Sequence, residues 1–253
     1  MNVKHLESAL SSLKREFPSP NVALEQYPTS AHLAARVIAL ASEKGDLQRG
    51  MTCLDLGCGT GMLTCAAAFL CDVVFAVDCD IEALRVAQEN ARSVELDDTT
   101  NFILARVRIG SNSRVANKGA SKRKGTGRGG GRGRGRGVRS PQRSTKEILI
   151  EGLSDGIPMK DNCVDTVISN PPFGTKMNEG IDAQFLRSAT RLARKAVYSF
   201  HKTSTRPFLS KLVAEWGFKL EVVAEMKFDI PQSYKFHKQA TKDVEVDLLR
   251  VVI

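Results

Sequence analysis

The sequence lacks three features that would each assign a protein to a particular class. No apolar run approaches about 18 residues, so a membrane-spanning helix is not predicted. The six cysteines include no Cys-x-x-Cys pair, which argues against both a zinc site and a disulfide framework. The first residues lack the hydrophobic stretch of a signal peptide and the composition of a transit peptide. We therefore expect a soluble protein of a reducing, intracellular compartment, with no bound metal and no membrane contact.

Acidic residues are missing from one segment, and this segment accounts for the charge of the chain. The 253 residues carry 37 Lys and Arg against 28 Asp and Glu, a formal net charge of +9. Residues 110–146 hold 12 of the basic residues and no acidic one, so the remainder has 25 basic and 28 acidic residues. The segment contains an Arg-Gly repeat and too little apolar surface to fold, which predicts a disordered, RG-rich basic insert. Its charge suits RNA phosphates, but a passive solvated loop is the alternative.

A glycine-rich turn follows a short apolar strand and reads Asp55-Leu56-Gly57-Cys58-Gly59-Thr60-Gly61. Glycines allow a backbone to approach a ligand closely, as in many nucleotide-binding turns. No Lys-Ser/Thr pair follows the turn, which excludes a P-loop. A second apolar run ends in Asp78, 21 residues after Gly57, where a carboxylate can accept both hydroxyls of a ribose. This combination resembles the S-adenosylmethionine site of class I methyltransferases.

A second motif, Asn170-Pro171-Pro172-Phe173, ends another apolar run. Its composition suits the alkylation of a planar amino group, whose lone pair is a poor nucleophile while it is conjugated with a ring. The side-chain carbonyl of Asn170 and the backbone carbonyl of Pro171 can hold the two amino protons, and the prolines stiffen the turn. Phe173 offers a face for stacking a flipped base. An ordinary Pro-Pro turn with a core phenylalanine is the alternative.

Apolar periodicity predicts helices alternating with strands in one domain of residues 1–253. Helical spacing from Leu6 to Phe17 and a second run at residues 31–44 predict a helical cap within residues 1–50. Beyond it, strands are predicted at 52–56, 73–77, 102–105, 147–150, 164–169, 196–200, 218–228 and 244–253, and helices at 62–70, 81–92, 182–194 and 207–216. The expected fold is α/β, a Rossmann-like doubly wound sheet with an antiparallel C-terminal strand, as in class I S-adenosylmethionine-dependent methyltransferases. Both motifs then lie at carboxyl ends of strands, where such sheets bind ligands.

Four short segments occur in an order that narrows this resemblance. They read EQYPT at residues 25–29, NPPFGTK at 170–176, AVYSFHK at 196–202 and SYKFHK at 233–238. Together they are similar to the methyltransferase-like protein 5 family over essentially the whole chain outside the insert. The resemblance implies N6 methylation of one adenosine in small-subunit, 18S-type rRNA. It also implies a heterodimer with a small zinc-binding methyltransferase activator protein, in the nucleus, including the nucleolus, or in the cytoplasm.

These resemblances also imply which residues contact the cofactor, S-adenosyl-L-methionine. The implied contacts are Gln26, Thr29, Asp55, Gly57, Gly59, Thr60, Gly61, Met62 and Asp78, and the Asn170 motif would grip the target adenine. Methyltransferases of this class usually add an acidic residue after the fourth strand, against the cofactor adenine. The first strand beside the insert ends at Arg106, which has the wrong charge, whereas the second ends at Glu151. We expect Glu151 in this role, with Asp155 as the alternative, and a hairpin of the two strands that carries the insert.

Basic residues near the predicted catalytic edge are candidates for contacts with RNA phosphates, namely Lys176, His201, Lys202, Lys235, His237 and Lys238. For each of them a solvated surface charge is the alternative interpretation. No histidine is required as a general base, because methyl transfer from a sulfonium is an in-line displacement that depends on positioning and electrostatics. Two other functions remain open, namely transfer to guanine N2 or a protein glutamine through the same motif, and a catalytically dead RG-rich RNA-binding protein.

Overall fold

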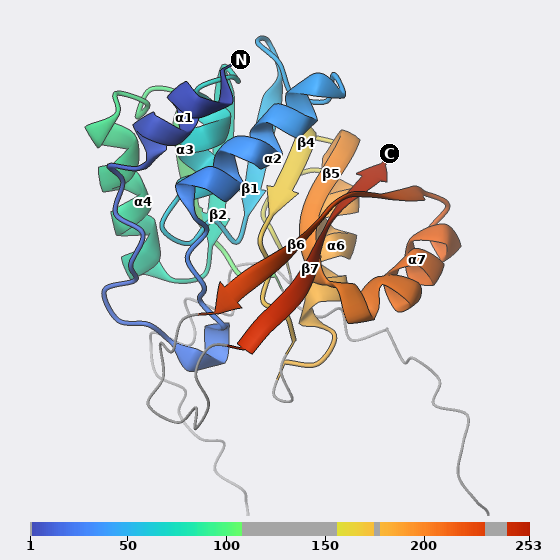
Figure 1. Cartoon of the computed structure of the whole chain (residues 1–253). Helices are drawn as coiled ribbons and strands as arrows, with labels where there is room; N and C mark the ends of the chain where they lie inside the picture. Colours follow the sequence, from blue (N-terminus) through green and yellow to red (C-terminus); the bar gives the residue numbers. More distant parts are fainter. Residues whose placement is uncertain (1, 108–155, 175–177, 231–241) are drawn as a thin grey trace, which may run out of the picture.

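The computed structural model describes residues 2–107, 156–174, 178–230 and 242–253, which form a mixed seven-stranded sheet between two layers of helices (Figure 1). The strands are β1 (Thr52–Leu56), β2 (Val73–Asp78), β3 (Thr100–Leu104), β4 (Val164–Ser169), β5 (Ala193–Lys202), β6 (Lys219–Ile230) and β7 (Lys242–Val252). Their order is β3-β2-β1-β4-β5-β7-β6. Neighbours from β3 to β5 run parallel, whereas β7 is antiparallel to both β5 and β6. The predicted doubly wound fold and its C-terminal hairpin are confirmed, with β6 at the edge.

Helices cover both faces of the sheet. The described helices are α1 (Val3–Leu10), α2 (Ala31–Glu43), α3 (Met62–Ala68), α4 (Ile81–Ser93), α6 (Ile181–Leu192) and α7 (Arg206–Glu215), with short 3-10 turns η1 (Val22–Leu24) and η2 (Thr203–Thr205). The first four lie together on one side in Figure 1, and α6 and α7 lie on the other. No helix among the described residues is both long and apolar enough to cross a membrane.

The first helix is shorter than the sequence pattern predicts. Leu6, Leu10 and Leu13 are buried as expected, but α1 ends at Leu10 instead of continuing to Phe17. The hydroxyls of Ser11 and Ser12 donate to backbone carbonyls three and four residues earlier. Serine side chains compete in this way with backbone hydrogen bonding, which favours the end of a helix over its continuation. The chain from Ser11 to α2 is therefore free to cross the carboxyl edge of the sheet.

The central strands β1 and β4 are buried on both faces, which explains why they are predicted so closely. In β1, Cys53 belongs to the core beneath α1, α2 and α3, whereas Leu54 and Leu56 belong to the core beneath α6 and α7. Each fully buried leucine contributes roughly 1.5–3 kcal/mol to folding. Strand order reverses between β1 and β4, and the carboxyl ends of the parallel strands meet there. A doubly wound sheet binds its ligands at such a point.

Candidate active site

The glycine turn after β1 requires glycine at two positions for steric reasons. Gly57 has φ 78°, and a Cβ atom there would lie 2.9 Å from Cε1 of Phe185. Gly61 has φ 82°, and its Cβ would lie 2.8 Å from Cβ of Ala87 in α4. A side chain at either residue would be strained in its backbone and in collision with a neighbour. The turn therefore brings its backbone close to α4 and α6 and lets α3 start directly beneath the pocket.

Asp55 lies in the interior next to this turn and links β1 to α3. Its side chain is fully buried, and Oδ2 accepts a 2.7 Å hydrogen bond from the hydroxyl of Thr64 in α3. Burial raises the pKa of Asp55 from 3.8 to about 7, because the charged form is desolvated there. Asp55 and Gly61 are not among the residues that line the pocket. In this structure both residues help to hold the turn, and a contact of either with the cofactor stays a prediction.

Asp78 ends β2 beside the same turn and is ready to accept further hydrogen bonds. Its Oδ2 accepts from the backbone N–H of Gly59 at 2.8 Å, and its Oδ1 accepts from the backbone N–H of Asp80 at 2.9 Å. Burial raises the pKa of this carboxyl, and the backbone donors oppose that shift. Each carboxylate oxygen has more than one acceptor position. The two amides therefore fix the carboxylate in place and leave capacity for the hydroxyls of a ribose.

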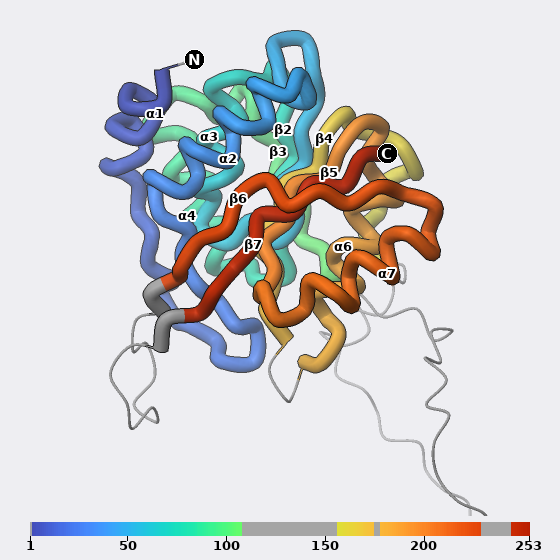
Figure 2. Tube along the Cα trace, turned by 45° about the vertical axis from the view of Figure 1, so that its right-hand side comes forward, coloured from blue at the N-terminus to red at the C-terminus, as the bar shows by residue number. Residues whose placement is uncertain are grey.

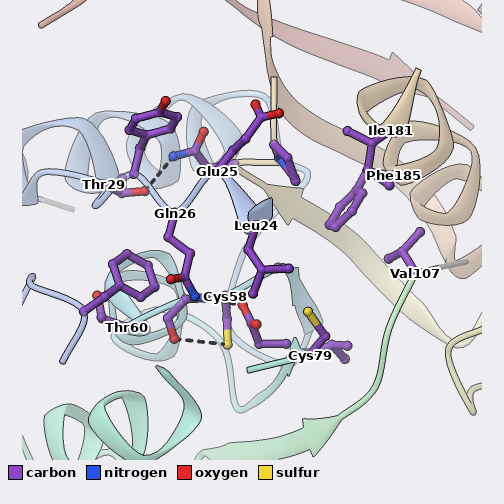
Figure 3. A pocket seen from close by; sticks show the side chains of 18 of the residues that line it. Leu24, Glu25, Gln26, Thr29, Cys58, Thr60, Cys79, Val107, Ile181 and Phe185 are labelled. Atoms are coloured by element: carbon purple, nitrogen blue, oxygen red, sulfur yellow. Dashed lines mark hydrogen bonds between the residues drawn. The ribbon is translucent and has the colours of Figure 1, made fainter. Parts of the chain in front are cut away.

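One pocket of about 1080 Å³, including its open mouth, joins the two motifs. Figure 3 shows Leu24 and Gln26 reaching into it from the N-terminal segment, with Phe185 and Ile181 of α6 on another side. The predicted residues that line it are Gln26, Thr29, Gly57, Gly59, Thr60, Met62, Asp78, Asn170 and Pro172. The cofactor motif and the acceptor motif therefore share one cavity, although more than 90 residues separate Asp78 from Asn170 in the chain.

The segment between α1 and α2 forms a wall of this pocket and is tied to the rest of the site. Nε2 of Gln26 donates to Oδ2 of Asp80 at 2.6 Å. The hydroxyl of Thr29 accepts from Nδ2 of Asn170 at 3.1 Å, the bond drawn dashed at Thr29 in Figure 3. Thr29 has only 9% of its surface exposed. The N-terminal segment thus touches the ends of both β2 and β4.

The phenylalanine of the acceptor motif is enclosed by other aromatic rings. Phe173 is 6% exposed and is not among the pocket-lining residues. The ring of Tyr27 is stacked with it at 6.4 Å between centroids and 22° between planes, and Phe228 of β6 packs edge-on at 6.0 Å. Figure 2 shows the β6–β7 hairpin running beside the segment that follows α1. One face of Phe173 is thus already occupied by Tyr27 in this structure, and the stacking of a base on Phe173 stays a prediction.

Comparison with known proteins decides the family. The chain is 36% identical over 251 residues to "rRNA N(6)-adenosine-methyltransferase METTL5" of Danio rerio, a match that covers 99% of this chain and 98% of that protein. A Drosophila melanogaster protein named as the same enzyme is 34% identical over 255 residues, with 100% and 97% covered. The chain belongs to the METTL5 family.

Two further similarities cover different lengths of this chain. The crystal structure of a Pyrococcus horikoshii protein described as a candidate RNA methyltransferase superposes with a TM-score of 0.70 at 29% identity, covering 100% of this chain and 98% of that one. The ribosomal protein L11 methyltransferase (PrmA) family matches only residues 29–116. The second match contains the glycine turn and Asp78 but ends before Asn170. The likeness to a protein methyltransferase is therefore a likeness of the cofactor half.

Several predicted site residues lie outside the described part of the chain. They are Glu151, Asp155, Lys176, Lys235, His237, Lys238 and the insert at 110–146, and with them the second strand of the expected hairpin. The first of those strands is β3, which pairs in parallel with β2, and Arg106, two residues after its end, lines the pocket. Lys202 ends β5 and is half-buried. The prediction of an RNA-binding rim position is wrong for His201, whose side chain is fully buried with Nδ1 3.5 Å from Oδ2 of Asp182.

Sequence reasoning missed two residues that line the pocket, Cys58 and Cys79, and one that holds the glycine turn, Asn90. Asn90 of α4 donates to the carbonyls of Lys14 and Thr60, which ties the N-terminal segment to the glycine turn, and no local pattern marks it. Cys58 and Cys79 line the pocket with thiols whose pKa is raised by burial, so both remain neutral at pH 7. The described residues contain no group of three or more His, Cys, Asp or Glu that could hold a metal.

Proposed function

We propose that this METTL5-family protein transfers the methyl group of S-adenosylmethionine to N6 of an adenosine in rRNA. The observation that carries the proposal is that Asn170 and Pro172 line the same pocket as Gly57 and Asp78. A methyl donor held at Asp78 and an amino group held at Asn170 would then meet inside one enclosed space. The METTL5 relatives of fish and fly carry the name of this activity.

The residues of the pocket suit S-adenosylmethionine. A nucleoside needs an acceptor for its ribose hydroxyls, and the Asp78 carboxylate is fixed by two backbone amides in the geometry for that role. Gly57 and Gly59 of the glycine turn line the pocket, so at these two positions no side chain stands between the backbone and a ligand. When bound, S-adenosylmethionine supplies a methyl group on a sulfonium, and the sulfur takes the electron pair of the broken C–S bond.

Asn170 prepares the acceptor. The exocyclic amino group of adenine is conjugated with the ring, and its nitrogen becomes nucleophilic when acceptors hold its two protons. Oδ1 of Asn170 can accept one of them, since Nδ2 of the same amide is bonded to Thr29. The nitrogen lone pair then forms the N–C bond, and the resulting ammonium loses one proton to water. Positioning and preorganised acceptors provide the acceleration, so no side chain has to act as a base.

A nucleoside analysis tests this function directly. The full-length protein would be incubated with methyl-labelled S-adenosylmethionine and in vitro transcribed small-subunit rRNA, and the RNA would then be digested to nucleosides. We expect the label in N6-methyladenosine. Label in N2-methylguanosine, or in protein glutamine when ribosomal proteins are offered instead, would reassign the acceptor. No transfer to any substrate, with or without an activator, would point to a non-catalytic RNA-binding protein.

Basic residues of the chain are the proposed contacts with the rRNA substrate. Lys202 ends β5 at the carboxyl edge of the sheet, where Asn170 also lies, and it retains exposed surface for a phosphate. Residues 110–146 add 12 positive charges. Deleting them should weaken RNA binding and flatten its dependence on salt, because fewer counterions are released. An unchanged salt slope would show that the insert does not contact RNA.

The partner and the compartment belong to the same proposal. We infer that the protein pairs with a small zinc-binding activator and acts in the nucleus, including the nucleolus, or in the cytoplasm, where rRNA is made and matured. Among the described residues, β3 lies at one edge of the sheet, and its last residue, Leu104, is 46% exposed and offers a position at which to test a contact with a partner. Co-expression followed by size-exclusion chromatography tests the pairing, and Leu104→Asp should disrupt it if this surface is used. Fluorescence microscopy of the tagged protein tests the compartment.

A further inference from the structure

The catalytic amide of Asn170 has one degree of freedom that its own strand does not fix. The backbone before it is anchored, because the hydroxyl of Ser169 donates to the carbonyl of Leu56 at 2.6 Å. Pro171 restricts the backbone after it. Neither contact decides which side of the amide, Oδ1 or Nδ2, faces the acceptor. The two orientations differ by a half-turn of the side-chain amide and have opposite chemistry.

The orientation matters for the transfer proposed above. An amide oxygen that faces the adenine amino group accepts one of its protons and favours a nucleophilic nitrogen. In the opposite orientation the amide NH2 faces the adenine amino group, so donors face donors and no hydrogen bond forms between them. A hydrogen bond that satisfies the amide NH2 in the first orientation would therefore raise the rate of methyl transfer without contacting the substrate.

Thr29 supplies such a bond. We propose that Thr29 is a positioning residue for Asn170, whose hydroxyl accepts from Nδ2 and so stabilises the orientation in which Oδ1 faces the acceptor base. A hydroxyl can also donate to an amide oxygen, so the amino protons of the base select the orientation, and Thr29 gives Nδ2 an acceptor in it. The donor–acceptor distance is 3.1 Å, and Thr29 is 91% buried. The contact joins residues 141 positions apart in the chain and is made by the N-terminal segment, not by the strand that carries the motif.

The hydroxyl is held in place by its neighbours in the chain. Pro28 fixes the backbone before Thr29. Ser30 directly after it caps α2, with its side chain accepting from the backbone N–H of Leu33 at 3.2 Å. Three residues earlier, the side chain of Gln26 donates to Asp80, which is itself bonded to Asp78, the carboxylate proposed to hold the cofactor ribose. Thr29 thus stands on a rigid element that also borders the cofactor site, as a positioning group requires.

This role differs from the one that the family resemblance implies, which is direct contact with the cofactor. Thr29 lines the pocket, so both roles are sterically open to it. Kinetic measurements can distinguish the two roles. Loss of a cofactor contact weakens the binding of S-adenosylmethionine but does not change the rate at saturating cofactor. Loss of the amide orientation lowers that rate but does not change cofactor binding.

The test compares Thr29→Val, which keeps the shape and removes the hydroxyl, with Thr29→Ser, which keeps the hydroxyl. Single-turnover methylation of in vitro transcribed small-subunit rRNA would be followed at saturating S-adenosylmethionine, and cofactor affinity by titration calorimetry. We expect Thr29→Val to slow transfer about tenfold with cofactor affinity within about twofold of wild type, and Thr29→Ser to restore most of the rate. Thr29→Ala serves in the same assay if the valine variant does not fold.

Two results would overturn the assignment. A Thr29→Val protein with the full rate removes any role for the hydroxyl in orientation, and one with weaker cofactor binding but an unchanged saturated rate makes Thr29 a cofactor contact. The role of Thr29 rests on the proposed function, and different results would contradict the role and the function. Without N6-methyladenosine from the wild-type protein the function itself is lost, whereas an active wild type with an equally active valine variant removes only the role of Thr29.

Discussion

Two groups of buried polar side chains lie toward opposite ends of the sheet and are satisfied in different ways. At the amino end of the parallel strands, Asp46 accepts from the hydroxyl of Tyr198 at 2.6 Å and from two nitrogens of Arg250 at 2.7 and 3.0 Å. Arg250 also donates to Glu221 at 3.0 Å. We call these four residues the anchor cluster. Both carboxylates in it pair with the single guanidinium of Arg250, and Glu221 is also paired with Lys219 at 2.9 Å.

The carboxyl end of the same strands is organised differently. Asp78 is held by backbone amides of Gly59 and Asp80, which are neutral donors, and Asn170 is held through its Nδ2. Neutral donors fix a side chain without cancelling its charge or filling its acceptor positions. The comparison shows how one sheet uses buried polar groups for stability at one end and reserves them for ligands at the other. Substitutions at the two ends should therefore affect different measurements.

Asn170→Ala should produce the largest effect, and only on catalysis. The variant loses the side-chain acceptor for the amino group, and removal of one preorganised group of this kind costs about 100-fold to 1000-fold in rate. Labelled nucleoside analysis should show methyl transfer near or below detection, while calorimetric titration shows S-adenosylmethionine still bound. Unchanged transfer would remove Asn170 from the mechanism, and an equal loss of cofactor binding would indicate a collapsed pocket.

Arg250→Met should act at the other end, on stability. Methionine keeps part of the volume but leaves the buried carboxylate of Asp46 without its cation, which costs about 3 kcal/mol of the free energy of unfolding. The rate of the folded protein should stay within about twofold of wild type. Chemical denaturation measures the first quantity and a single-turnover assay the second. The matched control is Arg194→Met, because Arg194 is half-exposed and pairs with Asp165 at the surface, where the loss should be at most about 1 kcal/mol.

The catalytic end was far more predictable from the sequence than the anchor cluster. Asp78 and Asn170 directly follow apolar runs that are buried on both faces, and the ends of parallel strands converge, so each residue could be placed from its own neighbours. Asp46 lies 152 residues from Tyr198 and 204 from Arg250. No local pattern records which distant polar side chains meet in the interior, because that depends on the register of β7 against β5.

The same limit applies inside the site. The sequence placed Phe173 in the acceptor motif, but its burial depends on Tyr27 and Phe228, which come from two other parts of the chain. His201 occupies a strand end that looks like a rim position, and the fold covers it with α6 and β7. Strand ends predict which edge a residue occupies. They do not predict whether its side chain points to solvent or to the interior.

Asp78→Ala should give a smaller effect, confined to the cofactor. The variant loses acceptors for two ribose hydroxyls, and we expect S-adenosylmethionine to bind roughly 30- to 100-fold more weakly. The rate at saturating cofactor should fall much less. Asp72→Ala is the control at the amino end of the same strand, where the exposed carboxylate accepts from the backbone N–H of Gly50. Equal affinities for both variants would show that Asp78 does not contact the cofactor.

Asp55→Asn should give the smallest effect, which appears only as a dependence on pH. Burial raises the pKa of Asp55 from 3.8 to about 7, so the folded protein keeps a proton there that the unfolded chain has already released. The contribution of this group to the free energy of unfolding therefore falls as pH rises from about 4 to about 7, and it is constant above that range. Asparagine does not titrate and still accepts from Thr64.

The difference in the free energy of unfolding between Asp55→Asn and wild type should consequently shift in favour of the variant, on the order of 2 kcal/mol between pH 5 and pH 8. Urea denaturation at a series of pH values measures this shift. Asp98→Asn, at an exposed position, should follow the wild-type curve throughout. Parallel curves for Asp55→Asn and wild type would mean that Asp55 is charged at pH 5 in the folded protein. The polar group behind the glycine turn would then resemble the charged anchor cluster instead of differing from it.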